Sequence, residues 1–276
     1  MSNRLFWLLA VVAVAATVAG VLVVRNRGGE PGSGGAAVAG TEDPALTAKM
    51  RRLAFYDWEP NVIGPAGRRA PGDPAVTGGA NAGRAGSVSL YDAVLRAARR
   101  PARAEPDNAR TTSLYYAVDP ARRRVFGGGA PSRALALAAV PAARRGAATV
   151  YEVKPDTMIV AAEGSRGRWY VLKDDVALPG SEIRDPRRAT DPVTGRSVIN
   201  FAFTDPGRVR FQQLTQALAR RGATSSLNRA GDDPAQHNQH FAVVAGGRIV
   251  ALPFVDFRLN PDGLDAGAGS QLDAPL

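Results

Sequence analysis

The hydrophobic pattern of this chain opens with one long apolar run and then breaks into short segments. Residues 5–24 are all apolar or small, and Arg4 and Arg25 stand at the two ends of this run. Twenty helical residues span about 30 Å, the thickness of the hydrocarbon core of a bilayer. A cleavable signal peptide has an apolar region of only about 7–15 residues before a small-x-small site, whereas this run ends in Leu22-Val-Val-Arg25. We therefore expect an uncleaved transmembrane helix within an anchor formed by residues 1–27.

Two later stretches have the composition of connecting segments. Gly28 to Gly40 is rich in Gly, Ser and Ala, which is typical of a flexible tether. We therefore expect a linker over residues 28–52. The stretch from Glu59 to Gly86 is dense in Gly, Pro and Asn and predicts a long loop.

One helix is well marked in the first half of the chain. Ser89 is a favourable N-cap, an apolar stripe follows it, and Pro101 stops it. Strand-like runs surround this helix, and we expect a hairpin across Lys154-Pro-Asp156. The predicted elements are a helical stripe of Leu90, Val94, Leu95 and Ala98, strands at residues 53–58, 112–118, 123–126, 149–153, 157–162 and 169–173, and a short helix at residues 132–139.

The pattern becomes more regular in the last hundred residues. Ser197 to Phe203 alternates between two faces, which predicts a strand. Thr204 or Asp205 then caps a helix that Gly222 is expected to end as a C′ residue.

A predicted β-hairpin follows this helix. Thr224–Asn238 is polar and predicts a mobile loop. Phe241–Val244 and Arg248–Ala251 are strand-like, and the two residues between them, Gly246-Gly247, are a strong turn signal. The whole pattern predicts an α+β fold, in which a single transmembrane helix precedes a two-part domain of mostly antiparallel sheets with helices on one face.

Charge and cysteine content narrow the possible chemistry. The net charge is +10, and residues 96–145 contain eleven arginines against three acidic residues. A basic patch binds nucleic acid or acidic lipid, but no nucleic-acid-binding module is visible. Beside a membrane anchor we expect lipid headgroups as the partner and no nucleic acid. The chain has no cysteine, which excludes thiol nucleophiles, Cys-based metal sites and disulfides.

Three short motifs are candidate sites. His237 and His240 are three residues apart, but their polar surroundings favour a solvated loop over a metal site. Asn260-Pro-Asp-Gly263 fits an Asp-Gly turn better than a calcium loop. Gly127-Gly-Gly129 lacks the flanking residues of a phosphate cradle, so a loop is expected there. We therefore expect no enzyme activity, no cofactor and no metal.

A group of phenylalanines near the C-terminus has two interpretations. The group consists of Phe201, Phe203, Phe211, Phe254 and Phe257. Core packing is the expected role of aromatic side chains on strand faces and helix flanks. The alternative is an apolar cleft for extended polypeptide, with Phe254 and Phe257 as the polypeptide-binding residues because they follow Pro253 near the end of the last hairpin.

Several of these segments together resemble SecD, the accessory subunit of the bacterial preprotein translocase. Leu178-Pro-Gly-Ser-Glu-Ile183 is similar to the lead-in of its extracytoplasmic head. Asp191 to Thr215 resembles its strand–helix unit, and Phe241-Ala-Val-Val244 with Gly247 and Pro253 resembles its hairpin. Tyr56-Asp-Trp58 and Ser89 to Ala93 also resemble the SecD base, less specifically.

The resemblance implies an architecture and a location. It implies a SecD-like base over residues 53–176 and a SecD-like head over residues 177–276. It also implies that this body lies outside the cytoplasmic membrane, although the positive-inside rule slightly favours the cytoplasmic side. In SecD the head leads into further transmembrane helices with the residues tied to proton flow. Because this sequence stops at Leu276, we expect either a truncated or stand-alone head or a part of a longer chain, and we carry over no proton-coupling residue.

The resemblance also implies a function. A SecD-like accessory component of Sec-dependent export would bind translocating, unfolded preprotein on the outer face of the cytoplasmic membrane. Its implied partners are the Sec translocon channel and a SecF-like protein. The alternative is a stand-alone, membrane-anchored envelope interaction module without a translocase role, which would use the arginine-rich residues 96–145.

Overall fold

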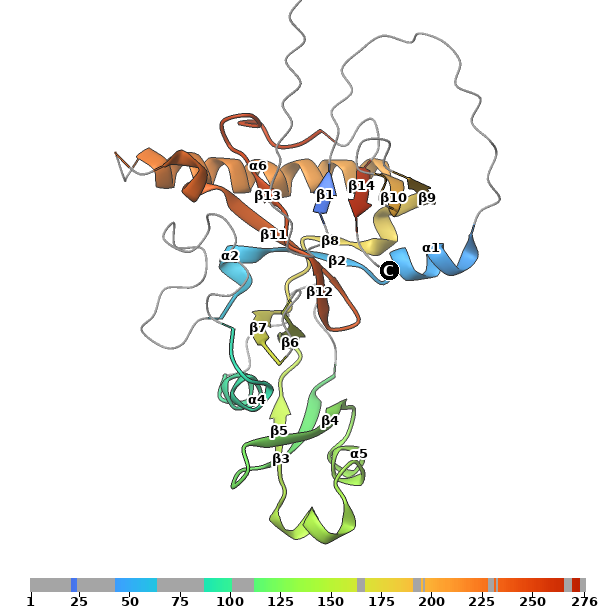
Figure 1. The fold of residues 1–276 in the computed structure, drawn as a ribbon, viewed down its shortest axis with the longest axis vertical. Coiled ribbons are helices and arrows are strands. Elements are labelled where there is room, and N and C mark those ends of the chain that lie inside the picture. The colour runs from blue at the N-terminus through green and yellow to red at the C-terminus, as the bar shows by residue number, and fades with distance from the viewer. Residues whose placement is uncertain are drawn as a thin grey trace, which may run out of the picture.

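The computed structural model describes residues 21–23, 43–63, 87–100, 112–162, 167–190, 195, 197–227, 231, 233–265 and 270–273. Three sheets and several helices form a mixed α+β fold in these residues (Figure 1). The molecule is elongated, with a four-stranded sheet and helix α6 toward one end and a three-stranded sheet at the other (Figure 1). The α+β class predicted from the sequence is confirmed.

The central sheet joins segments that are far apart in the sequence. Its order is β7-β6-β12-β11-β2-β8, and β13 also pairs with β11. Among the described strand pairs of this sheet only β6 and β12 run parallel. β2, from the N-terminal part, therefore lies between two strands of the C-terminal part. The strands are β2 (Ala54–Asp57), β6 (Thr157–Ala161), β7 (Trp169–Lys173), β8 (Leu178–Pro179), β11 (Gln239–Ala245), β12 (Arg248–Ala251) and β13 (Phe254–Val255).

The four-stranded sheet has the order β1-β14-β10-β9 and is antiparallel. Helix α6 (Asp205–Leu227) follows β10 and begins where Thr204 Oγ1 accepts a hydrogen bond from Gly207 N at 3.1 Å. Thr204 is therefore the cap, one of the two residues predicted. The strands are β1 (Val21–Val23), β9 (Ile183–Thr190), β10 (Ser197–Phe203) and β14 (Ser270–Asp273), and the 3₁₀ helix η3 (Gly180–Glu182) precedes β9.

The three-stranded sheet has the order β4-β3-β5 and is covered by short helices. α4 packs against β5 and β4 and also against β6 and β7, so it bridges two sheets, while α5 packs on β3 and β4. Ser89 and Ser132 cap these helices through their hydroxyl groups, as the sequence predicted for Ser89. The elements are α4 (Leu90–Ala98), β3 (Leu114–Asp119), β4 (Arg124–Ala130), α5 (Arg133–Ala138), the 3₁₀ helix η2 (Ala142–Ala147) and β5 (Thr149–Val153).

The N-terminal segments differ from the expectation in two places. Val21–Val23, part of the apolar run, form strand β1 paired with β14, so the predicted helix is wrong for these three residues. The rest of the run and Gly28 to Gly40 lie outside the described residues. Helix α1 (Pro44–Met50) lies within the expected linker. Asp43 caps this helix by accepting hydrogen bonds from two backbone N–H groups of its first turn. None of the helices in the described ranges is long and apolar enough to cross a membrane.

Three local predictions are wrong, the first two because contacts with distant segments decide the structure. β5 and β6 form no hairpin: β5 pairs with β3, and β6 pairs with β7 and β12. Gly222 does not end α6 but lies inside it, buried, where a Cβ would come within 2.9 Å of His237 O and 2.8 Å of the Phe257 ring. Gly127-Gly-Gly129 belongs to strand β4 instead of a loop.

Two further predictions need a smaller correction. The long loop does not start at Glu59, because Trp58–Asn61 form the helical turn α2, and residues 64–86 lie outside the described residues. Helix α4 buries Tyr91, Ala93, Val94 and Ala97, so only Val94 of the predicted stripe is fully covered.

The largest hydrophobic core lies between α6, the central sheet and the four-stranded sheet. Phe211 is fully buried, and its ring lies 5.1 Å from that of Phe203 and 5.8 Å from that of Phe241. Phe55 of β2 joins the same cluster. The core role expected for Phe201, Phe203 and Phe211 is confirmed.

Candidate functional site

The candidate site forms where strand β2 turns into helix α2. β2 pairs with residues 241–244 of β11, but from Trp58 the chain becomes helical. The backbone N–H of His240 therefore has no β2 partner on this side. The Glu59 carboxylate replaces the missing backbone acceptor: its Oε1 accepts a hydrogen bond from His240 N at 2.9 Å. His240 Nδ1 lies 3.1 Å from the same oxygen. The whole arrangement is buried, with Glu59 7% and His240 4% exposed.

Two more charged side chains complete this cluster. Arg221 of α6 forms two hydrogen bonds with Asp57, at 2.7 Å and 2.5 Å. The same guanidinium lies 3.9 Å from Glu59 Oε2, which is buried and has no hydrogen-bond partner among the described residues. A bidentate arginine–carboxylate pair fixes geometry as well as charge. Arg221 therefore holds helix α6 to the end of β2 in one orientation.

Phe254 lies on the outer side of this cluster. It belongs to the short strand β13, where it pairs with His240 of β11. The ring of Phe254 meets the His240 imidazole edge-on, with 6.0 Å between centroids. Its side chain is nevertheless 42% exposed. The buried Glu59–His240 pair thus supports an aromatic ring that faces solvent.

Phe257, the second predicted polypeptide-binding residue, has a different environment. It is partly buried and packs against the main core, beside Gly222 of α6. A Cβ at Gly222 would lie 2.8 Å from the Phe257 ring, so the glycine makes room for it. Phe257 therefore ties the last segment to α6, and Phe254 is the more open of the two.

The environment expected for the two histidines is wrong. His237 is fully buried and His240 nearly so, whereas a solvated loop was predicted. Part of the polar segment is helical: α6 extends to Leu227, and Pro234–His237 form the 3₁₀ helix η4. His237 Nδ1 lies 3.1 Å from Ser225 Oγ. Within the described ranges no three His, Asp or Glu side chains are grouped to hold a metal ion.

The Asp-Gly turn near the end of the chain is confirmed. Gly263 N donates to Asn260 O at 3.1 Å, and Gly263 has a φ of 85°. A Cβ on Gly263 would lie within 3 Å of α6, and Leu264 N donates to Thr215 Oγ1 at 2.8 Å. The turn therefore packs tightly against the helix.

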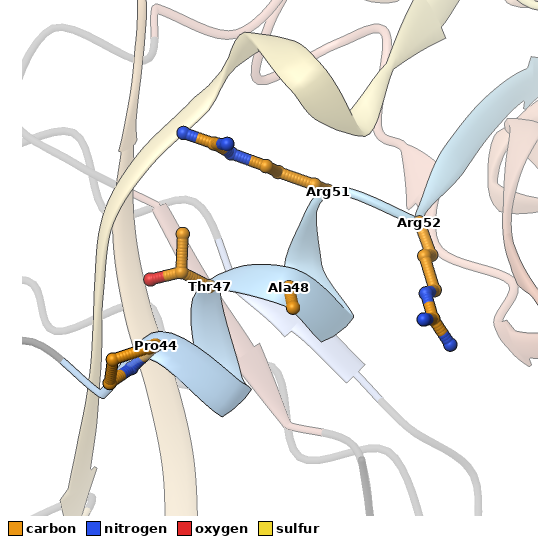
Figure 2. A pocket seen from close by; sticks show the side chains of 5 residues that line it. All are labelled: Pro44, Thr47, Ala48, Arg51 and Arg52. Atoms are coloured by element: carbon orange, nitrogen blue, oxygen red, sulfur yellow. The ribbon is translucent and has the colours of Figure 1, made fainter.

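An open cavity of about 500 Å³ lies beside helix α1. It is lined by Pro44, Thr47, Ala48, Arg51 and Arg52. Figure 2 shows the two arginine side chains pointing away from each other, Arg51 toward the neighbouring ribbon and Arg52 to the opposite side. Because they diverge, they do not form a clamp for one anionic group.

Sequence reasoning did not find Asp57, Glu59 or Arg221. Glu59 and His240 are 181 residues apart, and Asp57 and Arg221 are 164 apart. No spacing or motif links such residues. Asp57 lay at the end of a predicted strand and Glu59 at the start of a predicted loop, and neither position marked a site.

Comparison with known proteins identifies one region. Residues 156–271 match the family model described as SecDF, P1 head subdomain. No curated protein and no solved structure matches the chain. The match covers β6 to β13 and the start of β14, including Phe254 and His240, and supports a SecD/SecDF-like family and a role in Sec protein translocation.

Proposed function

We propose that this protein is a SecD-like accessory component of Sec-dependent export that binds unfolded preprotein through the surface around Phe254. The observation that carries the proposal is the exposed aromatic ring of Phe254, within the residues that match the SecDF head subdomain. Unfolded chains expose apolar side chains that a folded protein buries, so an open aromatic ring on a rigid support is a suitable contact for them.

The support of this ring favours a binding role. Phe254 lies on a two-residue strand next to the buried Glu59–His240 pair, so little conformational freedom has to be lost when a ligand covers it. A single exposed ring gives weak, exchangeable contact. A polypeptide that moves through a channel requires contacts of this kind, which hinder backsliding without stopping transport.

The proposed setting follows from the apolar run. We propose that the part of the N-terminal run before strand β1 anchors the chain in the cytoplasmic membrane, that the described body lies outside it, and that the Sec channel and a SecF-like protein are its partners. The head match supports the proposed association with the Sec channel, because the family's head is a translocation accessory domain.

The experiment is a binding titration of the purified full chain with a reduced, alkylated polypeptide that cannot fold. Full burial of a phenylalanine contributes about 1.5–3 kcal/mol. Phe254 is 42% exposed, so its complete covering contributes about 0.6–1.3 kcal/mol, a roughly 3- to 9-fold change in Kd. Phe254→Ala is expected to weaken binding by that factor. Val209→Ala, at a 54% exposed apolar position on α6, serves as the matched control. Equal affinity of the two variants, with both folded, would exclude Phe254 as the contact.

A further inference from the structure

The segment that caps the three-stranded sheet has an unusual surface composition. Residues 133–147, which form α5, η2 and the turn between them, consist only of Ala, Leu, Val, Pro, Gly and three Arg. The surface of a water-soluble domain normally mixes both charge signs with neutral polar side chains. This segment therefore has a surface suited to a partner other than bulk water.

Packing of the domain does not account for this composition. Ala136 and Val140 point inward, into a small core with Ala117, Phe126 and Val150. Leu135 lies on the other side and is 56% exposed. The exposed small residues of the segment are Ala134, Ala138, Ala139, Pro141, Ala142, Ala143, Gly146 and Ala147. The apolar character thus continues over the outer face, where the core gains nothing from it.

Two of the three cations of the segment lack an acidic partner. Within the described ranges Arg144 and Arg145 form no ion pair with a carboxylate, whereas Arg133 is close enough to Glu152 to contribute to lowering the pKa of that carboxyl. Arg145 Nε donates to Val140 O at 3.2 Å, which orients its guanidinium beside the turn between α5 and η2. By contrast, Arg122 and Arg123 of the β3–β4 turn are paired with Asp119 and Asp92.

We infer that the α5–η2 segment docks on an anionic lipid surface. Arginines beside exposed apolar side chains, with no acidic residue among them, suit binding at a lipid interface, where the apolar atoms of Leu135 and its neighbours enter the headgroup boundary and the cations meet anionic lipid. Protein interfaces, in contrast, are built around large aromatic or arginine anchors in pockets. This segment offers only Leu135 as a large exposed apolar side chain.

Lipid contact by the α5–η2 segment would constrain how the long axis of the molecule lies relative to the membrane. Strand β1, the described part of the N-terminal apolar run, lies toward the end of the molecule opposite α5 (Figure 1). If the proposed anchor and the α5–η2 segment contact the same bilayer, the long axis lies along the membrane surface instead of standing upright. This contact is independent of preprotein binding at Phe254.

The absence of cysteine makes a direct test possible. An environment-sensitive fluorophore is attached to Leu135→Cys in the full chain, which is reconstituted into vesicles that carry a lipid-linked quencher. Phosphatidylcholine vesicles are compared with vesicles that also contain phosphatidylglycerol. The control position is Val209→Cys, 54% exposed in helix α6. The further variant Arg144→Ser with Arg145→Ser carries the probe at position 135.

We expect a blue shift and quenching at position 135 in the anionic vesicles only, with most of the signal lost in the double serine variant. Position 209 is expected to show neither change. Absence of quenching at 135, equal quenching in both lipids, or equal quenching at 135 and 209 would overturn the inference. Shielding of the probe at 135 only when purified Sec channel is added to the vesicles would assign the surface to a protein and would equally overturn it.

Discussion

Replacing Phe55 by alanine tests whether the N-terminal segment belongs to the same folding unit as the matched head. Phe55 lies in β2, outside the matched residues 156–271, yet it is fully buried in the main core. Its ring stacks with that of Phe241 at 6.3 Å and meets that of Phe203 edge-on at 6.1 Å. Removing the ring therefore leaves a cavity between three strands of the two larger sheets.

The expected loss is large. Buried Phe→Ala substitutions cost about 3–5 kcal/mol, while whole domains have about 5–15 kcal/mol of stability. For a unit of about 150–250 residues, each kcal/mol lowers the Tm by about 2–4 °C. We therefore expect Phe55→Ala to lower the Tm by about 6–20 °C.

The assay is thermal unfolding of the full chain in detergent, followed by near-UV circular dichroism, with pulse proteolysis in urea as a second readout. Val209→Ala is the control, since surface substitutions change stability by only about 0.5 kcal/mol. If Phe55→Ala were as stable as Val209→Ala, β2 would not be a structural strand of the head, and the pairing of β2 with β11 would be wrong.

Three further predictions concern individual contacts. Glu59→Ala leaves the buried His240 N–H without an acceptor and is expected to lower the free energy of unfolding in urea by about 1–3 kcal/mol. Glu59→Gln keeps an acceptor and is expected to lower it less. Equal losses of stability in the two variants would contradict the role given to Glu59. Gly263→Ala is expected to destabilise the protein more than Gly231→Ala in the same assay. Both glycines have a positive φ, but only at Gly263 would an added Cβ lie within 3 Å of atoms of α6. Equal losses of stability would mean that the close approach to α6 does not affect the free energy of unfolding. The hydrogen bond from the Ser89 hydroxyl and the pairing with Arg123 lower the pKa of Asp92. The ionised Asp92 therefore stabilises the folded state at pH values above the ordinary Asp pKa of about 4, and this stabilisation is lost as the pH falls through the lowered pKa. Ser89→Ala is expected to raise the pKa of Asp92 in an NMR titration, and an unchanged value would exclude the hydroxyl as the cause.

Local signals in the sequence were reliable where the structure depends on local chemistry. Ser89 and Thr204 cap their helices through side-chain oxygens, and Gly246-Gly247 forms the predicted turn with positive φ at both residues. Each of these features is decided by a few neighbouring residues, so one sequence is enough to predict it.

Features that depend on distant contacts could not be predicted in the same way. Gly222 was predicted to end a helix, but its missing side chain instead admits Phe257 and His237 O, which come from later segments. The turn at Lys154-Pro-Asp156 was recognised, but the strands on its two sides pair in different sheets. The Glu59–His240 pair had no sequence signal because strand pairing alone brings the two residues together.

Site-directed crosslinking during translocation tests the proposed function most directly. A photoreactive amino acid is placed at Phe254, and in a matched sample at Val209, in membranes that are exporting a stalled preprotein. The proposal predicts adducts with the preprotein from position 254, dependent on active translocation, and few or none from position 209. Equal adducts from both positions, or none from position 254 in a folded and membrane-bound chain, would contradict preprotein binding at this surface.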